Sequence, residues 1–206
     1  FNHIYSKDGK IFLKADHNCE HVIVQEGVTT IASYAFDSCR AKRVTLPNSV
    51  QTIAPNAFLR ARQLESIVLQ EGITTIGSYA FQYCSKLREI TLPHSLQNLG
   101  HNAFYCCDKL AVININGNFT WSEDWLSENP FGLLREIEKI TNTNPNFVIE
   151  DGVLYNSQKT ILFRVPVKQL ELLLPSTLKY VAANACKKCR YIPSIQFPKS
   201  IEYIGK

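Results

Sequence analysis

The sequence predicts an α/β-type solenoid dominated by β-structure, in which turns of roughly 22–23 residues stack into one continuous body with a parallel sheet along one face. Three observations predict this fold. The sequence repeats itself at a nearly fixed spacing, each repeat contains a short alternation of apolar and polar residues, and most repeats carry the pair Ala-Phe. At 206 residues the chain is long enough for a stack of this kind with one shared core.

The repetition is clearest between residues 22 and 112. Four successive segments align there: Val22 to Arg43, Val44 to Ser66, Ile67 to Glu89 and Ile90 to Val112. A further copy runs from Leu172 to Ser194, and a truncated copy begins at Ile195. A single turn cannot bury its own apolar face, so neighbouring turns must stack and share a core.

Each repeat reads as one strand, one turn and one buried pair. The stretch from Leu87 to Leu92 ends in an apolar alternation typical of a half-buried strand, and Pro93 ends it without loss of a central ladder bond. Equivalent strands lying about 4.8 Å apart would form a parallel sheet. We expect the small-large pairs to lie in the core, at Ala35-Phe36, Ala57-Phe58, Ala80-Phe81 and Ala103-Phe104.

We expect one solenoid over residues 1–206, with two irregular parts. Residues 1–21 resemble the end of a hairpin module, 22–112 hold four regular repeats, 113–171 hold a divergent repeat and a hairpin insertion, and 172–206 hold regular repeats of which the last is truncated. The Asp151-Gly152 turn between apolar runs predicts the hairpin, and the segment from Ile4 to Leu13 echoes it 150 residues earlier. Because the chain begins without Met and stops within a repeat, we interpret it as a fragment or a processed product.

The repeat pattern resembles that of a known family. Leu-x-x-Ile-x-Leu-Pro, followed by Leu-Gly and then Ala-Phe-x-x-Cys-x-x-Leu, is carried by Leu87 through Phe104 with Cys107 and Leu110. This is similar to the BspA-like, or Treponema pallidum type, leucine-rich repeat surface proteins, and the similarity extends over nearly the whole chain. It implies a right-handed, curved leucine-rich repeat solenoid, a location on the surface of bacteria or parasitic protozoa, and adhesion to host matrix proteins, host cells or other microbes. Two departures are local: residues 113–133 lack the Ala-Phe and Cys positions, and Cys186 replaces the expected Phe.

The expected binding surface is the concave face of the sheet, because solenoid curvature creates an extended groove there. Its exposed strand positions and flanking charges are predicted to be Thr45, Val68, Thr91, Asn114 and Gln196, with Arg43, Glu65, Arg88 and Arg135. Small polar groups with a few charges suit a broad protein contact better than a small-ligand pocket. Trp121 and Trp125 form a second candidate contact, since aromatic residues are frequent at binding hot spots; the alternative is that they fill the core of the divergent repeat. Tyr34 and Tyr79 form either an aromatic stripe or packing filler.

The seven cysteines do not predict a metal or redox site. Cys186-x-x-Cys189 could be redox-active or half of a zinc site, but Cys189 holds the repeat position of Cys39, Cys84 and Cys107, which favours a structural role and free thiols. His94 or His101 could assist Cys106 as a nucleophile, but an orienting group and an oxyanion site are not evident in the sequence. We therefore expect no enzyme, cofactor or metal. Asn118-Phe119-Thr120 is a glycosylation sequon by pattern only.

Composition narrows the partner class. The net charge of +4 comes without clustering of Lys and Arg, so nucleic acid is not an expected partner. No apolar run is long enough to span a bilayer. The function expected is an extracellular or cell-surface, adhesin-like module that binds a protein ligand from a host matrix or a neighbouring cell. The alternatives are an intracellular interaction scaffold, which free cysteines also suit, and a repeat region attached to an enzyme elsewhere in the protein.

Overall fold

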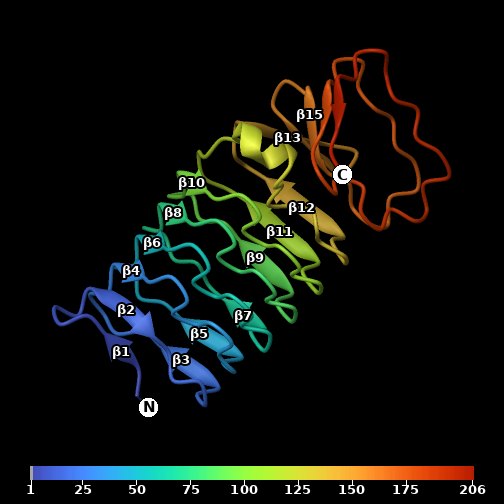
Figure 1. Ribbon diagram of the computed structural model, residues 1–206. Coiled ribbons are helices and arrows are strands. Elements are labelled where there is room, and N and C mark those ends of the chain that lie inside the picture. Colours follow the sequence, from blue (N-terminus) through green and yellow to red (C-terminus); the bar gives the residue numbers. More distant parts are fainter. Residues whose placement is uncertain (1) are drawn as a thin grey trace.

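The computed structural model describes residues 2–206, whose solenoid turns follow one another in chain order from the N-terminal end (Figure 1). The predicted β-dominated solenoid is confirmed. The one helix found in residues 2–206 is the short 3-10 helix η1, Glu123–Leu126.

Two ladders of strands run along the stack, and their strands pair in parallel except for the antiparallel first pair of one ladder. Ladder A pairs one strand from each turn in the order β1 (Ile4–Tyr5), β2 (Ile11–Lys14), β4 (Thr30–Ile31), β6 (Thr52–Ile53), β8 (Thr75–Ile76), β10 (Asn98–Leu99). Ladder B comprises two three-stranded sheets, β3 (His21–Ile23), β5 (Arg43–Thr45), β7 (Ser66–Ile67) and β9 (Glu89–Thr91), β11 (Val112–Ile115), β12 (Lys139–Asn142). Ladder B is the sheet that the sequence predicts. Ladder A was missed, because a two-residue Thr-Ile strand is too short to show an alternation.

The strand register matches the sequence alignment of the repeats. Val44 of β5 lies opposite Val22 on one side and Ile67 on the other, and Ile113 lies opposite Ile90 and Ile140. These central residues are buried, while their neighbours in β3, β5 and β9 are exposed. The alternation therefore turns one face of each strand to the core and the other to the surface.

The core is a column of phenylalanine rings. Phe36, Phe58, Phe81 and Phe104, together with Phe12, are buried, and successive ring centroids lie 4.9, 4.4, 4.9 and 5.7 Å apart with nearly parallel planes. The Ala that precedes Phe in each regular repeat is also buried, and its small size brings neighbouring backbones together. Each added turn thus extends the same column.

The last sheet contains an antiparallel insertion. β13 (Phe147–Glu150), β14 (Val153–Asn156) and β15 (Ile161–Arg164) are antiparallel, and β16 (Tyr180–Val181) and β17 (Tyr203–Ile204) then continue in parallel. Tyr155 lies opposite Leu162, as Tyr5 lies opposite Phe12 at the N-terminal end, so the same hairpin pairing occurs 150 residues apart.

The divergent repeat is filled by aromatic side chains. Trp125 is only 1% exposed, and its ring lies 5.7 Å from both Phe131 and Phe163 and 6.0 Å from Phe147, measured between centroids. The suggestion that Trp125 contacts a ligand is therefore wrong, because burial of its large apolar ring fills the core where the Ala-Phe pair is missing. Trp121 is only partly buried.

All seven cysteines have free thiols. The repeat-position cysteines reach back to a preceding turn: the Sγ of Cys84 donates to the Phe58 carbonyl at 3.3 Å, and that of Cys107 donates to the Phe81 carbonyl at 3.1 Å. Cys39 donates in the same way to the backbone carbonyl of Asp16, and Cys189 to the backbone carbonyl of Val165. A weak thiol donor thus supports stacking at this position.

Candidate functional site

The exposed positions of ladder B form one row along the stack. Thr45 in β5 and Thr91 in β9 are exposed, Val68 follows β7 and is 68% exposed, and Asn114 in β11 is half-buried. Asn114 lies opposite Thr91, so residues far apart in the sequence become neighbours. We call this series the ladder B row. Ile23, opposite Thr45 and 61% exposed, and Thr141, opposite Asn114, also belong to it. Extending the repeat register to β3 and β12 would have identified them.

Part of the ladder B row is a fixed polar network. The side-chain amide of Asn114 donates to Glu89 Oε1 and to Thr91 Oγ1, both at 2.9 Å. Its oxygen accepts a hydrogen bond from the Thr141 hydroxyl at 2.6 Å. These bonds hold the polar groups in place before any partner arrives, which lowers the entropy cost of binding.

The predicted flanking charges lie beside this row. Arg43 begins β5, while Glu65, Arg88 and Arg135 are exposed shortly before a strand or turn of ladder B. Arg135 Nε lies 3.1 Å from Asp108 Oδ1, and similar ion pairs between turns join Lys42 to Glu20 and Lys109 to Glu136. Charges of both signs therefore lie beside the ladder B row and pair between neighbouring turns.

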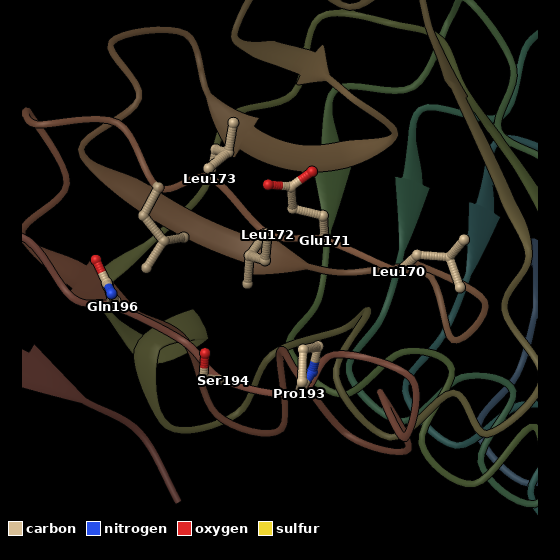
Figure 2. Close-up of a pocket in the computed structure, with 8 residues that line it drawn as sticks. Leu170, Glu171, Leu172, Leu173, Pro193, Ser194 and Gln196 are labelled. Atoms are coloured by element: carbon tan, nitrogen blue, oxygen red, sulfur yellow. The ribbon is translucent and has the colours of Figure 1, made fainter.

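A groove lies in the C-terminal part of the chain, where the repeat pattern of ladder B recurs (Figure 2). Its volume is about 680 Å³, and it is lined by Leu170, Glu171, Leu172, Leu173, Leu174, Pro193, Ser194 and Gln196. We call it the leucine groove. Leu173 and Gln196 hold the same repeat position as Thr91, but the two segments around them form no strand, so a space remains between them.

The leucine groove exposes leucine at two positions where the regular repeats mix polar and apolar residues. Leu170 and Leu173 are 72% and 73% exposed; the equivalent positions hold Arg88 and Thr91 in one regular repeat and Glu65 and Val68 in another. Of the groove residues, sequence reasoning found only Gln196. The signal for the others was leucine at both of these exposed positions in one repeat, which gains nothing for the core.

A second recess lies beside ladder A. It has a volume of about 510 Å³, and Thr120, Trp121 and Ser122 line one side of it, opposite residues of β6, β8 and β10. Trp121 therefore reaches a surface, whereas Trp125 does not. Of the two tryptophans considered as an aromatic contact, Trp121 remains a candidate and Trp125 does not.

Ser78, His101 and Glu128 form a chain of polar contacts near this recess. His101 Nδ1 lies 3.3 Å from Ser78 Oγ, and His101 Nε2 lies 3.1 Å from Glu128 Oε2. The arrangement serves to join Glu128 to the regular repeats.

Cys106, Cys186 and Cys189, the cysteines considered for redox, metal or nucleophilic chemistry, lie in surroundings that disfavour the reactive thiolate. Burial raises the pKa of Cys186 to about 11 and also raises the pKa values of Cys189 and Cys106. Arg164, next to this pair in space, is buried and donates to backbone carbonyls that include those of Asn184 and Ala185, both at 2.9 Å. Burial lowers the pKa of Arg164 to about 10, so it remains a cation at neutral pH.

Neither histidine considered as a base is bonded to Cys106. His94 Nδ1 lies 3.1 Å from Glu71 Oε1, and His101 pairs with Glu128. Among residues 2–206, no group of three or more His, Cys, Asp or Glu side chains is arranged to hold a metal ion. In the same part of the chain, no helix has the length and apolarity needed to cross a membrane.

Comparison with solved structures supports the fold. A leucine-rich repeat protein from Eubacterium ventriosum matches with a TM-score of 0.71 and 24% identity over 90% of this chain and 50% of its own. The pneumococcal vaccine antigen PcpA matches with a TM-score of 0.63 and 20% identity over 95% of this chain and 59% of its own. The chain thus spans about half the length of these two proteins. The leucine-rich repeat protein of T. pallidum matches with a TM-score of 0.54 and 22% identity, over 70% of this chain and 80% of its own.

Sequence comparison gives the family. No curated protein sequence matches significantly. The profile of the BspA type leucine rich repeat region matches in six copies, over residues 9–129 and 162–206. Residues 1–8 lie outside the match, as do residues 130–161, which contain the end of the divergent repeat and most of the antiparallel insertion. The chain therefore belongs to the BspA type leucine-rich repeat family.

Proposed function

We propose that this chain is an adhesin-like binding module at the cell surface, which recognises a protein ligand along the ladder B row and uses the leucine groove as its apolar anchor. The observation that carries the proposal is the exposure of Leu170 and Leu173 in a groove that shares the repeat positions of the row. Buried apolar anchors surrounded by polar groups are typical of protein–protein interfaces.

The polar part of the row suits the same role. The Thr91–Asn114–Thr141 network offers fixed hydrogen-bonding groups, and Ile23 and Val68 add exposed apolar area. Charges of both signs flank the row and would steer a partner with a complementary pattern rather than one with uniform charge.

The proposed location rests on similarity. A leucine-rich cell surface protein from Faecalibacterium prausnitzii matches with a TM-score of 0.53 and 19% identity, over 98% of this chain and 70% of its own. One observation favours an intracellular interaction scaffold instead: seven free thiols suit a reducing compartment. Labelling of intact cells with an antibody against this chain, with and without external protease, decides between the two. Labelling that appears only after permeabilisation contradicts the surface location.

Binding is tested with a panel of immobilised host matrix proteins. Replacement of Leu173 by Asp places a charge in the leucine groove and should weaken capture by at least about tenfold, since loss of an anchor costs about 2 kcal/mol or more. The matched control is Leu13→Asp, which changes an exposed leucine of β2 in ladder A. Equal capture by wild type and Leu173→Asp, or equal loss in both variants, would contradict the assignment of the groove.

The row is tested separately with Thr45→Arg and Val68→Arg together. These positions lie outside the Asn114 network, so that network should persist; the variant removes the exposed bond between Thr45 Oγ1 and His21 Nε2, 2.9 Å long. We expect an unchanged thermal transition and reduced capture. Full capture by this variant would restrict the contact to the leucine groove.

A further inference from the structure

Ladder A is interrupted after β10. In the regular turns, each strand receives amides from the next turn: Thr75 N donates to the Gln51 carbonyl at 3.2 Å, and Gly77 N donates to the Ile53 carbonyl at 2.8 Å. Gln97 and Leu99 hold the corresponding acceptor positions in β10. Their carbonyls receive no amide from residues 120–124, so β10 is the outer strand of its sheet within residues 2–206.

The cause of the interruption is the divergent repeat. The following turn stays in register up to Asn118, whose amide donates to the Leu96 carbonyl at 3.1 Å. Beyond it, Trp121 occupies the position where Asn98 stands in β10, and the chain leaves the ladder to form η1. Burial of Trp125 explains this departure, because it fixes η1 over the core.

The 510 Å³ recess beside ladder A, which we call the Trp121 groove, extends over β6, β8 and β10 as far as Thr120, Trp121 and Ser122 of this turn. Its lining residues are uncharged. A Cβ on Gly77 would lie 2.4 Å from Pro55 N, and one on Gly100 would lie 2.2 Å from Ser78 N, so glycine at these positions lets the backbones of successive turns approach closely. The groove thus offers an open strand edge beside an aromatic side chain.

The rim of the Trp121 groove is acidic. Glu123 and Asp124 begin η1 directly after the lining residue Ser122, and both are exposed. Within residues 2–206 neither carboxylate takes part in an ion pair, and the residues that line the groove include no Lys or Arg. The charge complementary to this rim is positive.

We propose that the Trp121 groove binds an extended, basic polypeptide segment of a partner protein, which adds as a strand to the outer edge of β10. Amides of the segment donate to the carbonyls of Gln97 and Leu99, its side chains pack against Trp121, and a Lys or Arg pairs with Glu123 or Asp124. Strand addition to an open sheet edge is a recurrent mode of peptide recognition. This site uses the other ladder and is independent of the ladder B row and the leucine groove.

The test uses fluorescein-labelled hexapeptides and fluorescence anisotropy at low salt. The probe alternates valine and lysine, a second peptide has glutamate in place of lysine, and a third carries N-methyl groups on the amides that would donate to the edge. We expect saturable binding of the lysine peptide and at least about tenfold weaker binding of the other two. Equal binding of the N-methylated peptide would overturn strand addition, and equal binding of the glutamate peptide would overturn the basic preference.

Variants separate this site from the rest of the surface. Glu123→Gln with Asp124→Asn should weaken the lysine peptide by about fivefold without loss of folding, because both side chains are exposed. Leu173→Asp, in the leucine groove, is the control and should bind as wild type. Amide exchange provides a second measurement: binding should slow exchange at Leu99, on the outer edge of β10, and leave Asn98, bonded to the Thr74 carbonyl, unchanged. Unchanged exchange at Leu99, or equal weakening by Leu173→Asp, would overturn the proposal.

Discussion

At the scale of single residues, the backbone contains a repeated strain that the sequence does not display. The residue before the Ala of each Ala-Phe pair, and before the equivalent Ala185, adopts a left-handed conformation: φ is 61° at Tyr34, 59° at Asn56, 58° at Tyr79, 48° at Asn102 and 56° at Asn184. Asn tolerates this conformation, whereas Tyr gives no signal of it. The Ala-Phe pair could therefore be placed from the sequence, but the turn in front of it could not.

This strain yields the first prediction. Tyr34→Asn should raise the free energy of unfolding by about 0.5–1 kcal/mol, because Asn adopts the left-handed conformation at lower cost. Tyr34 is exposed, and its carbonyl, which accepts a bond from Lys14 Nζ, remains in the variant. Urea denaturation measures the change, with Asn56→Tyr as the reverse exchange. A less stable Tyr34→Asn variant would show that the tyrosine ring contributes more than the backbone strain costs.

The second prediction concerns Cys186. With a pKa of about 11, only about one thiol in a thousand is ionised at pH 8, so alkylation by iodoacetamide should be slow and should rise about tenfold per pH unit up to pH 10. Because the pKa of Cys186 is raised in the folded state, a rise in pH should lower the stability of the protein. Above pH 9 the unfolded thiol loses its proton while the folded one retains it, so the contribution of Cys186 to stability falls between pH 9 and 11. Mass spectrometry of labelled peptides measures the rate, and rapid labelling at pH 8 would contradict the assigned environment.

At the scale of elements, the paired hairpins and the strands of ladder B were predictable because apolar alternation and an Asp-Gly turn are local signals. The loss of strands around Leu172 and Gln196 was not. The segment around Leu172 keeps the repeat pattern, but the chain between it and β12 adds the three antiparallel strands β13 to β15. A strand needs a neighbour for its hydrogen bonds, and that neighbour is a property of the fold rather than of the segment.

The contact of the divergent turn with the regular repeats gives the third prediction. Glu128 accepts a hydrogen bond from the Tyr79 hydroxyl at 2.9 Å, lies 3.1 Å from His101 Nε2, and its carbonyl accepts a bond from the Asn102 amide. Glu128→Ala removes the side-chain contacts and should cost about 0.5–1 kcal/mol, since the groups are partly exposed. Hydrogen exchange should accelerate in residues 120–128 and stay unchanged in residues 22–76. Uniform acceleration along the chain would show that the Glu128 contacts support the whole stack rather than this turn.

At the scale of the whole molecule, the fold followed from repetition, whereas the candidate sites lie where repetition fails. The register alone placed Thr45, Thr91 and Asn114 on one surface. The leucine groove and the Trp121 groove arise where one turn no longer pairs with the next, at segments 170–174 and 120–124. Regular turns specify one another through nearest-neighbour packing, so an irregular turn changes the surface without ending the stack.

The same nearest-neighbour packing makes the phenylalanine column the most sensitive part of the molecule. Phe81 lies between Phe58 and Phe104 at centroid distances of 4.9 and 5.7 Å and is fully buried. Phe81→Ala should therefore lower the free energy of unfolding by about 3–5 kcal/mol, because the cavity weakens two interfaces between turns at once. Tyr83→Ala, which changes an exposed aromatic residue of the same repeat, should have a much smaller effect. If the stack divides at the weakened turn, the denaturation curve of Phe81→Ala should also broaden or split, whereas an unchanged thermal transition would contradict the shared core.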